Sequence, residues 1–381
     1  MSLENMIPMV DTLAWHKPIQ KELKQAATRV LDSGRYILGE EVAGFEQDVA
    51  HYLQAKETVS CANGTDALVL ALSAAGLGPG DEVITTPFTF FATAEAIVRV
   101  GATPVFVDIE PESFNIDPAR VQAAVTRKTR AVLAVHMFGM PARIQEIQAL
   151  CKDHSLWLIE DCAQSFGACV NGQMTGTFGD FGCFSFFPSK NLGGFGDGGL
   201  VTAQSGAMAE QLKVLRNHGS RVQYQHEYVG YNSRLDEMQA ALLRVKLKHI
   251  EHYNKERRKL AECYRTHLQG VEVLLPSGME HVYHQFTILV DQRDNLKAHL
   301  ANQGIASAVY YPLSLHQQPV FKDLKITQDL FVAEQTARRC LSLPIFPGMK
   351  EAQVKHVAKA VSGFFAEASE SPGYWFSEAA S

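Results

Sequence analysis

The stretch from Trp157 to Leu200 constrains the fold of this chain more than any other part of the sequence. An apolar run in it ends in the carboxylate of Asp161, and a second run about twenty residues further on delivers Ser185. Lys190 follows and leads into NLGGFGDGG, whose glycines let the backbone bend freely and approach a ligand closely. We therefore expect two strands that bring a carboxylate, a hydroxyl and an amine to one ligand site.

This set of side chains fits the chemistry of pyridoxal phosphate (PLP) held as a Schiff base. The amine of Lys190 can attack the cofactor aldehyde, and Asp161 can keep the pyridine nitrogen protonated so that the ring accepts electrons. Each piece alone has an ordinary explanation: a solvated lysine, a helix-capping aspartate or a turn glycine. Their order and spacing together favour a cofactor lysine.

Composition and charge exclude several other functional classes. The 381 residues are 46% hydrophobic and 20% charged, which is ordinary for a globular protein with one large core and a smaller one. A net charge of -6 gives no indication of nucleic acid or an acidic membrane surface as a partner. Because no apolar run approaches about twenty residues, we expect no membrane span.

The cysteines and the N-terminus indicate the compartment. Seven cysteines without a Cys-x-x-Cys pair predict buried thiols in a reducing, cytoplasmic setting. They do not suggest a disulfide or zinc framework, so no metal site is expected. Residues 1–13 lack the basic segment and apolar core of a signal peptide.

Strand and helix patterns alternate before residue 255, which predicts a largely parallel sheet with helices on both faces. Ligands of such sheets bind beyond the carboxyl ends of the strands. Gly64, Phe90, His136 and Asp161 all fall at such ends, although His136 is better explained as a hydrogen-bonded rim residue than as a catalytic one. One short strand is expected to begin at residue 58, and further strands are expected at 82–86, 103–108, 130–136, 157–161 and 199–203. Helices are expected at 17–31, 44–54, 142–151 and 207–217.

We expect three parts in the chain: a large domain at 1–254 with an N-terminal arm, a smaller α+β domain at 255–366, and a mobile tail at 367–381. A long helix with breaks is expected from Tyr231 to His267. In the smaller domain we expect strands at 271–275, 285–290 and 308–312, and helices at 296–303, 331–340 and 351–365.

Two local patterns would suit parts of the cofactor. Gly64 and Thr65 start a helix, where free N–H groups and a hydroxyl would suit a phosphate; alone this would be a simple capped helix, but with the lysine present we favour phosphate. Phe88, Phe90 and Phe91 follow the 82–86 strand, where one aromatic ring could stack on a pyridine ring. All three are equally plausible as core residues, and at most one should stack.

Taken together, the motifs resemble those of the PLP-dependent sugar aminotransferases of the DegT/DnrJ/EryC1/StrS type, within the fold-type-I aminotransferases. The resemblance runs from Ile7 to about Phe365 and implies an α/β fold with a mostly parallel, seven-stranded type of sheet. The chain departs from the family pattern at HMFGM, residues 136–140, and after Glu367. The matching segments are SCANGTDAL at 60–68, PGDEVI at 79–84, IEDCAQ at 159–164, SFFPSKNLG at 185–193, GDGG at 196–199 and NSRL at 232–235.

The resemblance implies a role for each matching residue. Lys190 would form the Schiff base and shuttle protons, Asp161 would hold the pyridine nitrogen, and Gln164 would lie by the ring and its oxygen. Phe90 would stack on the ring. Asn232 would reach the cofactor phosphate of the neighbouring subunit, so that a homodimer shares its active sites. The phosphate ligands implied within one chain are Gly64, Thr65 and Ser185.

Within the family, the chain looks most like the aminotransferases that act on UDP-2-acetamido-2-deoxy-3-oxo-glucuronate, with L-glutamate as the amino donor. Those enzymes serve the synthesis of bacterial surface polysaccharides such as the O-antigen of lipopolysaccharide. The resemblance lies in residues 36–39, 61–67, 221–226 and 311–319.

The expected substrate contacts remain open between two explanations. A uronate carboxylate favours an arginine fork, and Arg234 is placed for it next to Asn232, but a structural salt bridge is equally plausible. Tyr310 and Tyr311 could contact the sugar or cap a strand.

Three other functions compete with this reading. A dTDP-linked keto-deoxysugar is an alternative substrate. Sugar dehydratases of the family carry histidine in place of the lysine, so Lys190 argues against that activity. A non-catalytic, PLP-binding or regulatory relative would keep the fold without turnover, and the intact Asp161, Gln164, Ser185 and Lys190 argue against it.

Overall fold

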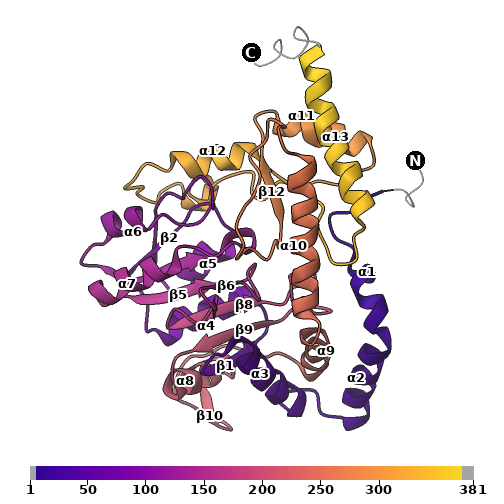
Figure 1. Cartoon of the computed structure of the whole chain (residues 1–381). Helices are drawn as coiled ribbons and strands as arrows, with labels where there is room; N and C mark the ends of the chain where they lie inside the picture. Colours follow the sequence, from indigo (N-terminus) through magenta and orange to yellow (C-terminus); the bar gives the residue numbers. More distant parts are fainter. Residues whose placement is uncertain (1–5, 371–381) are drawn as a thin grey trace.

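The computed structural model describes residues 6–370, with side chains to residue 366, and has a seven-stranded sheet at its centre (Figure 1). β9 alone runs antiparallel to its neighbours, β1 and β8, and the remaining pairs are parallel. The mostly parallel sheet expected from the sequence is therefore confirmed. In spatial order the strands are β1 (Glu57–Cys61), β9 (Gly199–Ala203), β8 (Phe181–Ser185), β5 (Trp157–Asp161), β4 (Thr129–Val135), β2 (Glu82–Thr85) and β3 (Thr103–Phe106).

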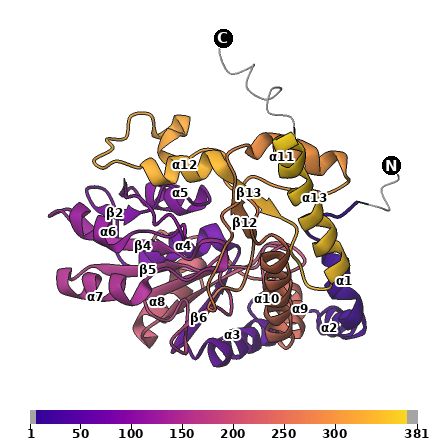
Figure 2. The same cartoon turned by 45° about the horizontal axis from the view of Figure 1, so that its top comes forward.

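Helices cover both faces of the sheet because successive strand residues point to opposite faces. Leu133 of β4 packs into the core on one face, and its neighbour Val132 packs into the core on the other. One face is covered by α4 (Gly64–Ala74), α5 (Ala92–Arg99) and α8 (Gly206–Arg216). The other is covered by α3 (Glu40–Leu53), α6 (Pro118–Ala124), α7 (Ile144–His154) and α9 (Glu237–Leu247) (Figure 2).

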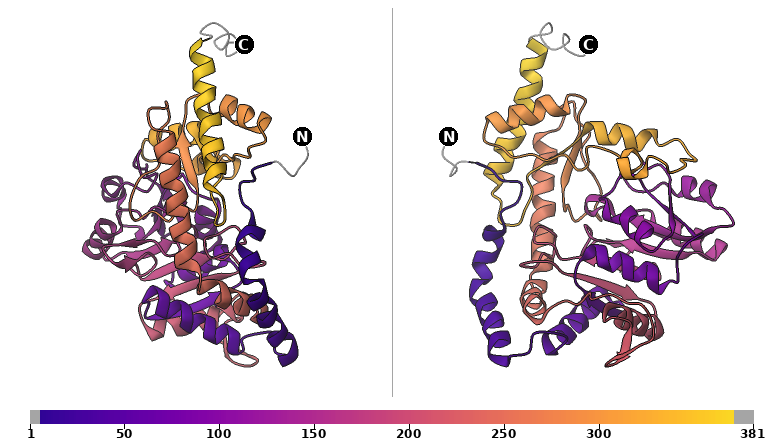
Figure 3. Two further views of the ribbon diagram at one scale, coloured as in Figure 1. Left: turned by 45° about the vertical axis from the view of Figure 1, so that its right-hand side comes forward. Right: turned by 180° about the vertical axis from the view of Figure 1, so that it is seen from behind.

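The N-terminal helices run along one side of the molecule (Figure 3). α1 (Thr12–His16) leads through a 3-10 turn at Lys17–Ile19 into α2 (Gln20–Ser33). The apolar residues at helical spacing in this segment, Leu23, Ala26 and Val30, pack against α9. The periodicity of the sequence thus predicted both the helix and the face that it buries.

The start of α9 is joined to the start of α3 by one buried carboxylate. Glu237 Oε1 accepts hydrogen bonds from the backbone N–H groups of Gly39 at 2.7 Å and Val42 at 2.9 Å, and Oε2 accepts from that of Glu41 at 2.9 Å. These are N–H groups that a helix cannot satisfy within itself. A side chain nearly two hundred residues away therefore caps α3.

A second core forms around a small antiparallel sheet of β12 (Phe286–Leu289) and β13 (Cys340–Leu343) (Figure 2). The expected boundary at residue 254 falls inside α10, whose Tyr253 packs into this second core, so the division into domains stays a prediction. The helices around this sheet are α10 (Ile250–His267), α11 (Arg293–Asn302), α12 (Phe331–Arg339) and α13 (Glu351–Glu370), and two 3-10 turns lie at Leu315–Gln317 and Pro319–Phe321.

Two expected strands, the start of one helix and the expected tail differ from the structure. The segments 271–275 and 308–312 are not strands, because each makes only one isolated backbone bridge and proline follows or ends the segment. The helix expected from Tyr231 begins only at Glu237, where the Asp236 side chain accepts from Gln239 N and caps it. Of the expected tail, residues 367–370 belong to α13, and 371–381 lie outside the described residues.

Two short hairpins complete the described chain: β6 (Cys169–Val170) with β7 (Gln173–Met174), and β10 (Ser220–Val222) with β11 (Gln225–His226). All seven cysteines are free, and only Cys169 and Cys263 are partly exposed. Within residues 6–370, no helix has the length and apolar character needed to cross a membrane.

Candidate functional site

Asp161 lies at the carboxyl end of β5, and its side chain is almost fully buried. Its Oδ2 accepts a hydrogen bond from Thr93 Oγ1 at 2.9 Å, and its Oδ1 accepts from the backbone N–H of Ala163 at 3.1 Å. Burial raises the pKa of this carboxyl group, while the two hydrogen bonds and the charge of Lys190 act in the opposite direction. Since burial outweighs them, the site favours a further positive group against this carboxylate.

Lys190 lies in the tight loop that joins β8 to β9. Its backbone N–H donates to Phe187 O at 2.8 Å. A Cβ added to Gly193 would clash with Pro188 O, so only glycine fits there. Burial lowers the pKa of the Lys190 amine to about 8, against the opposing charge of Asp161. The neutral fraction of this amine at pH 7 is therefore much larger than for an ordinary lysine with a pKa of 10.5, and only a neutral amine is a nucleophile.

The N-terminus of α4 meets β8 to form a cradle. A Cβ added to Gly64 would lie 2.6 Å from Ser185 Cβ, so the two segments touch only because residue 64 is glycine. Asn63 caps the helix through Asp66 N at 2.8 Å, and the first N–H groups of α4, including that of Thr65, have no carbonyl partner within the helix. Together with the Ser185 hydroxyl, they form a set of donors that fits a phosphate group.

The structure separates the three candidate aromatic residues that follow β2. Phe88 is only 1% exposed in the core, and Phe91 packs against Phe321 at 6.0 Å between ring centroids. Phe90 is 55% exposed, and its ring lies 6.0 Å from that of Tyr311. Only Phe90 of the three therefore presents its ring for stacking.

Gln164 links this ring region to the segment that carries Tyr310 and Tyr311. Its Oε1 accepts from the backbone N–H of Phe138 at 2.7 Å, which fixes the amide so that Nε2 donates to the Tyr311 hydroxyl at 3.2 Å. The ring of Tyr310 lies 5.9 Å from that of Tyr311, and the peptide bond between the two is cis. Tyr311 therefore lies beside Phe90, and Tyr310 lies next to Tyr311.

Asn232 and Arg234 follow the β10–β11 hairpin and precede α9. Asn232 is exposed, and Arg234 Nη1 donates to Asn217 Oδ1 at 3.1 Å. Between them, Ser233 Oγ accepts from Ala62 N at 3.2 Å, which places this segment against the turn before the cradle. Neither residue forms a hydrogen bond with Asp161 or Lys190 in the described part of the chain.

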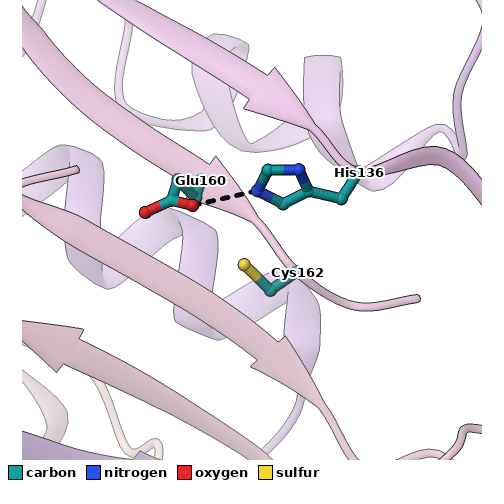
Figure 4. A group of neighbouring side chains, drawn as sticks. All are labelled: His136, Glu160 and Cys162. Atoms are coloured by element: carbon teal, nitrogen blue, oxygen red, sulfur yellow. Dashed lines mark hydrogen bonds and ion pairs between the residues drawn. The ribbon is translucent and has the colours of Figure 1, made fainter. Parts of the chain in front are cut away.

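His136, Glu160 and Cys162 form a buried cluster (Figure 4). His136 Nδ1 accepts from Ala142 N at 3.0 Å, so Nε2 carries the proton and donates to Glu160 Oε2 at 2.9 Å. Both Glu160 oxygens also accept backbone N–H groups from the turn at 176–179. Because these bonds use both ring nitrogens and both oxygens, the cluster locks β4, β5 and this turn together. His136 is therefore a fully buried, hydrogen-bonded residue, not one at the rim.

Two groups near the site were missed by sequence reasoning. Thr93 bonds Asp161 directly, and its place at the start of a helix just after Phe90 was the available signal. His284 comes from the second core and contacts Asn191 at 3.2 Å, and burial together with the charge of Lys190 holds its pKa well below the usual range. No local pattern around His284 pointed to a residue almost a hundred positions away.

Comparison with known proteins adds to this geometry. A family model described as the DegT/DnrJ/EryC1/StrS aminotransferase family matches residues 17–362. The chain is 48% identical over 366 residues to a pleiotropic regulatory protein of Geobacillus stearothermophilus, covering 94% of this chain and 98% of that protein. It is also 48% identical over 364 residues to the UDP-N-acetyl-3-dehydro-alpha-D-glucosamine 3-aminotransferase of Acidithiobacillus ferrooxidans, covering 95% and 98%.

A third relative is the UDP-2-acetamido-2-deoxy-3-oxo-D-glucuronate aminotransferase of Pseudomonas aeruginosa, which is 39% identical over 360 residues and is covered in full, against 94% of this chain. Among solved structures, DesV of S. venezuelae in complex with a ketimine intermediate superimposes with a TM-score of 0.92. That chain is 42% identical, and the match covers 94% of this chain and 98% of DesV.

Proposed function

This chain belongs to the DegT/DnrJ/EryC1/StrS aminotransferase family and is a PLP-dependent aminotransferase, and on that premise we propose that it moves an amino group from L-glutamate to the C3 ketone of a UDP-linked 2-acetamido sugar. The observation that carries this proposal is the pairing of the buried Asp161 carboxylate with the Lys190 amine, whose charges shift each other's pKa. The relatives from Acidithiobacillus and Pseudomonas are both named for 3-keto sugars of this kind.

PLP, when bound, supplies an aldehyde and an electron-accepting ring. The residues around it divide the remaining work. The neutral Nζ of Lys190 would be the amine that joins the cofactor, and when free it would take and return protons as a general base. Asp161 would hold the proton on the ring nitrogen, and the donors at Gly64, Thr65 and Ser185 would hold the phosphate. Phe90 would stack on the ring.

For C6 of the sugar we propose a carboxylate bound by Arg234. Among the described residues its side chain donates a hydrogen bond to the neutral amide oxygen of Asn217 and forms no ion pair. Its charge is therefore free to meet a carboxylate from outside the chain. A second candidate is the neutral C6-hydroxymethyl sugar, which is favoured by the higher identity to the 3-dehydro-glucosamine enzyme. A dTDP-linked keto-deoxysugar is the third choice of substrate.

We also propose that the enzyme is a homodimer whose sites are shared through Asn232. The apolar side chains of Tyr36, Ile37 and Leu38 are about half exposed, and Ile37 forms a backbone bridge with Asp236, close to Asn232 in the chain. An exposed apolar patch of this kind is typical of an interaction surface.

Two measurements test the proposed activity. First, the Schiff base of the purified enzyme gives a visible absorbance band, and L-glutamate should bleach it; a non-catalytic regulatory relative would leave the band unchanged. Second, the three keto-sugars are compared as amino acceptors by kcat/KM. A higher kcat/KM for the uronate would support a substrate with a C6 carboxylate. Equal values for the uronate and its C6-hydroxymethyl analogue would instead favour the neutral sugar as the substrate.

Arg234→Ala tests the proposed contact. A lost guanidinium–carboxylate contact costs roughly 2–3 kcal/mol, so kcat/KM for the uronate should fall about thirty- to hundredfold. The rate on the C6-hydroxymethyl analogue should not change. Arg338→Ala, which removes a solvent-exposed arginine of α12, serves as the control. If the uronate is preferred but Arg234→Ala has no effect, the sugar stands and only this contact is wrong.

A further inference from the structure

Asp161 is held by a chain of two buried hydroxyl groups that the transamination described so far does not use. Thr93 Oγ1 lies 2.9 Å from Asp161 Oδ2, and Thr89 Oγ1 lies 3.0 Å from Thr93 Oγ1. Both threonines are at most 2% exposed. The chain runs from the turn after β2, through the first turn of α5, to the end of β5.

The direction of the protons in this chain follows from their number. An ionised carboxylate only accepts hydrogen bonds, and each threonine hydroxyl has a single hydrogen to donate. Thr93 must therefore direct its hydrogen to Asp161, and the hydrogen between the two threonines must come from Thr89. Both hydroxyl dipoles then point toward the carboxylate, an arrangement in which each bond strengthens the next.

This use of Thr93 is not explained by the helix in which it lies. Threonine in a helix commonly bonds to the carbonyl oxygen four residues back, whereas the Thr93 hydroxyl reaches another element, 68 positions along the chain. Together with Ala163 N on Oδ1, it fixes both carboxylate oxygens and hence the orientation of the group.

We propose that Thr93, supported by Thr89, is a positioning residue for transamination, which keeps the Asp161 carboxylate ionised and aimed at the cofactor nitrogen. This inference rests on the role proposed for Asp161. Burial pushes the pKa of Asp161 upward and the Thr93 bond pulls it down, so loss of the bond leaves less carboxylate at a given pH. The other titratable groups around Asp161 are Lys190, His136, Glu160, Tyr311, Cys162 and Cys183.

Thr93→Val tests the proposal because it replaces the hydroxyl with a methyl group of similar volume. We expect the dissociation constant of PLP from the apoprotein and kcat/KM to worsen roughly tenfold each, the effect of losing one hydrogen bond to a charged group. The acid limb of the pH profile should move to higher pH, because protonation of Asp161 then begins earlier. Thr93→Ser restores the hydroxyl and should return both quantities to near the parent values.

Two further variants separate this role from simple packing. Thr89→Val keeps Thr93 but removes its donor, so it should shift the acid limb in the same direction by a smaller amount. Thr287→Val breaks a comparable buried hydroxyl pair, Thr287 with Ser342 at 2.8 Å in the small sheet, and should shift neither PLP binding nor the acid limb.

The outcomes are distinct. An unchanged acid limb and unchanged PLP binding in Thr93→Val, or a loss that Thr93→Ser does not restore, would overturn the positioning role. If Thr93→Val does not fold, the shift in Thr89→Val decides, and no shift there overturns the proposal as well. Asp161→Asn is measured in parallel: if it retains full activity, the role of Asp161 itself is wrong, whatever Thr93 does.

Discussion

At the scale of single residues, burial sets the chemistry of the site. It disfavours the charged forms of both Lys190 and Asp161, lowering the pKa of the amine and raising that of the carboxyl group. Opposite shifts of this kind on neighbouring groups are typical of catalytic sites. Burial therefore makes the Lys190 amine a better nucleophile, because more of it is neutral. It also means that the ionised Asp161 carboxylate is stabilised by a positively charged partner.

Lys190→Ala should abolish transamination and leave the fold intact, because Lys190 is the proposed Schiff-base partner and base and lies in a loop rather than in a core. Steady-state turnover and the visible absorbance band of the Schiff base measure the loss of function, and circular dichroism measures whether the fold is intact. Lys56→Ala, at an exposed lysine, is the control. Turnover by Lys190→Ala without an added amine would refute the assignment.

The lowered pKa of Lys190 predicts how the apoprotein takes up PLP. Below about pH 8 the amine is mostly protonated and cannot attack, so the Schiff-base band should form faster as the pH rises and level off above that value. Stopped-flow absorbance on apoprotein, with Lys190→Ala as the blank, gives the profile. A rate still climbing toward pH 10.5, the ordinary value for lysine, would show that the amine is not perturbed.

At the scale of elements, helix ends held by distant side chains position the parts around the site. Glu237 at the start of α9 is 3% exposed and accepts three N–H groups at the start of α3. A carboxylate at a helix N-terminus also interacts favourably with the helix dipole. The segment with Tyr36 and Ile37 is thereby tied to α9.

Glu237→Gln should destabilise the protein by about 2 kcal/mol, because a buried charged acceptor with several hydrogen bonds is replaced by a neutral amide with one oxygen. Urea unfolding monitored by circular dichroism measures the change. Glu40→Gln is a matched control, since Glu40 lies at the same helix end with its side chain 92% exposed. Equal stabilities for the two variants would contradict the capping role.

The sequence predicted elements well where the pattern is local and poorly where the partner is distant. The strands of the main sheet were predicted because apolar runs, turns and helices alternate there. The cap from Glu237 and the approach of His284 could not be predicted, since neither residue has a local signal for a partner so far along the chain. The segment 271–275 looked like a strand, but Leu274 is its only paired residue, and strand pairing depends on an edge that the sequence does not reveal.

At the scale of the whole molecule, the family model matches residues 17–362, which is nearly the entire chain. The proposed sharing of active sites involves two copies of this chain. Within one chain Asn232 is exposed and forms no hydrogen bond with Asp161 or Lys190 among the described residues. In the proposed dimer, a complete site would need the Lys190 loop of one subunit and the exposed Asn232 segment of the other.

Mixed dimers test this arrangement. Lys190→Ala and an Asn232→Ala variant should each be inactive or nearly so, and co-refolding the two should restore part of the activity, because one site of each heterodimer then has both residues. Differently tagged chains show that heterodimers form. No recovery in isolated heterodimers would rule out shared sites. Lys190→Ala refolded alone is the negative control and should stay inactive.

The distribution of the cysteines has a practical consequence. Five of the seven thiols are buried, and only Cys169 and Cys263 are partly exposed. Three of the buried thiols lie close enough to Asp161 or to one another to interact: Cys61, Cys162 and Cys183. A coloured thiol reagent should therefore react with two groups quickly and with five only when the chain opens. The rate of the slow phase would then report how fast the native protein opens, with no substitution needed.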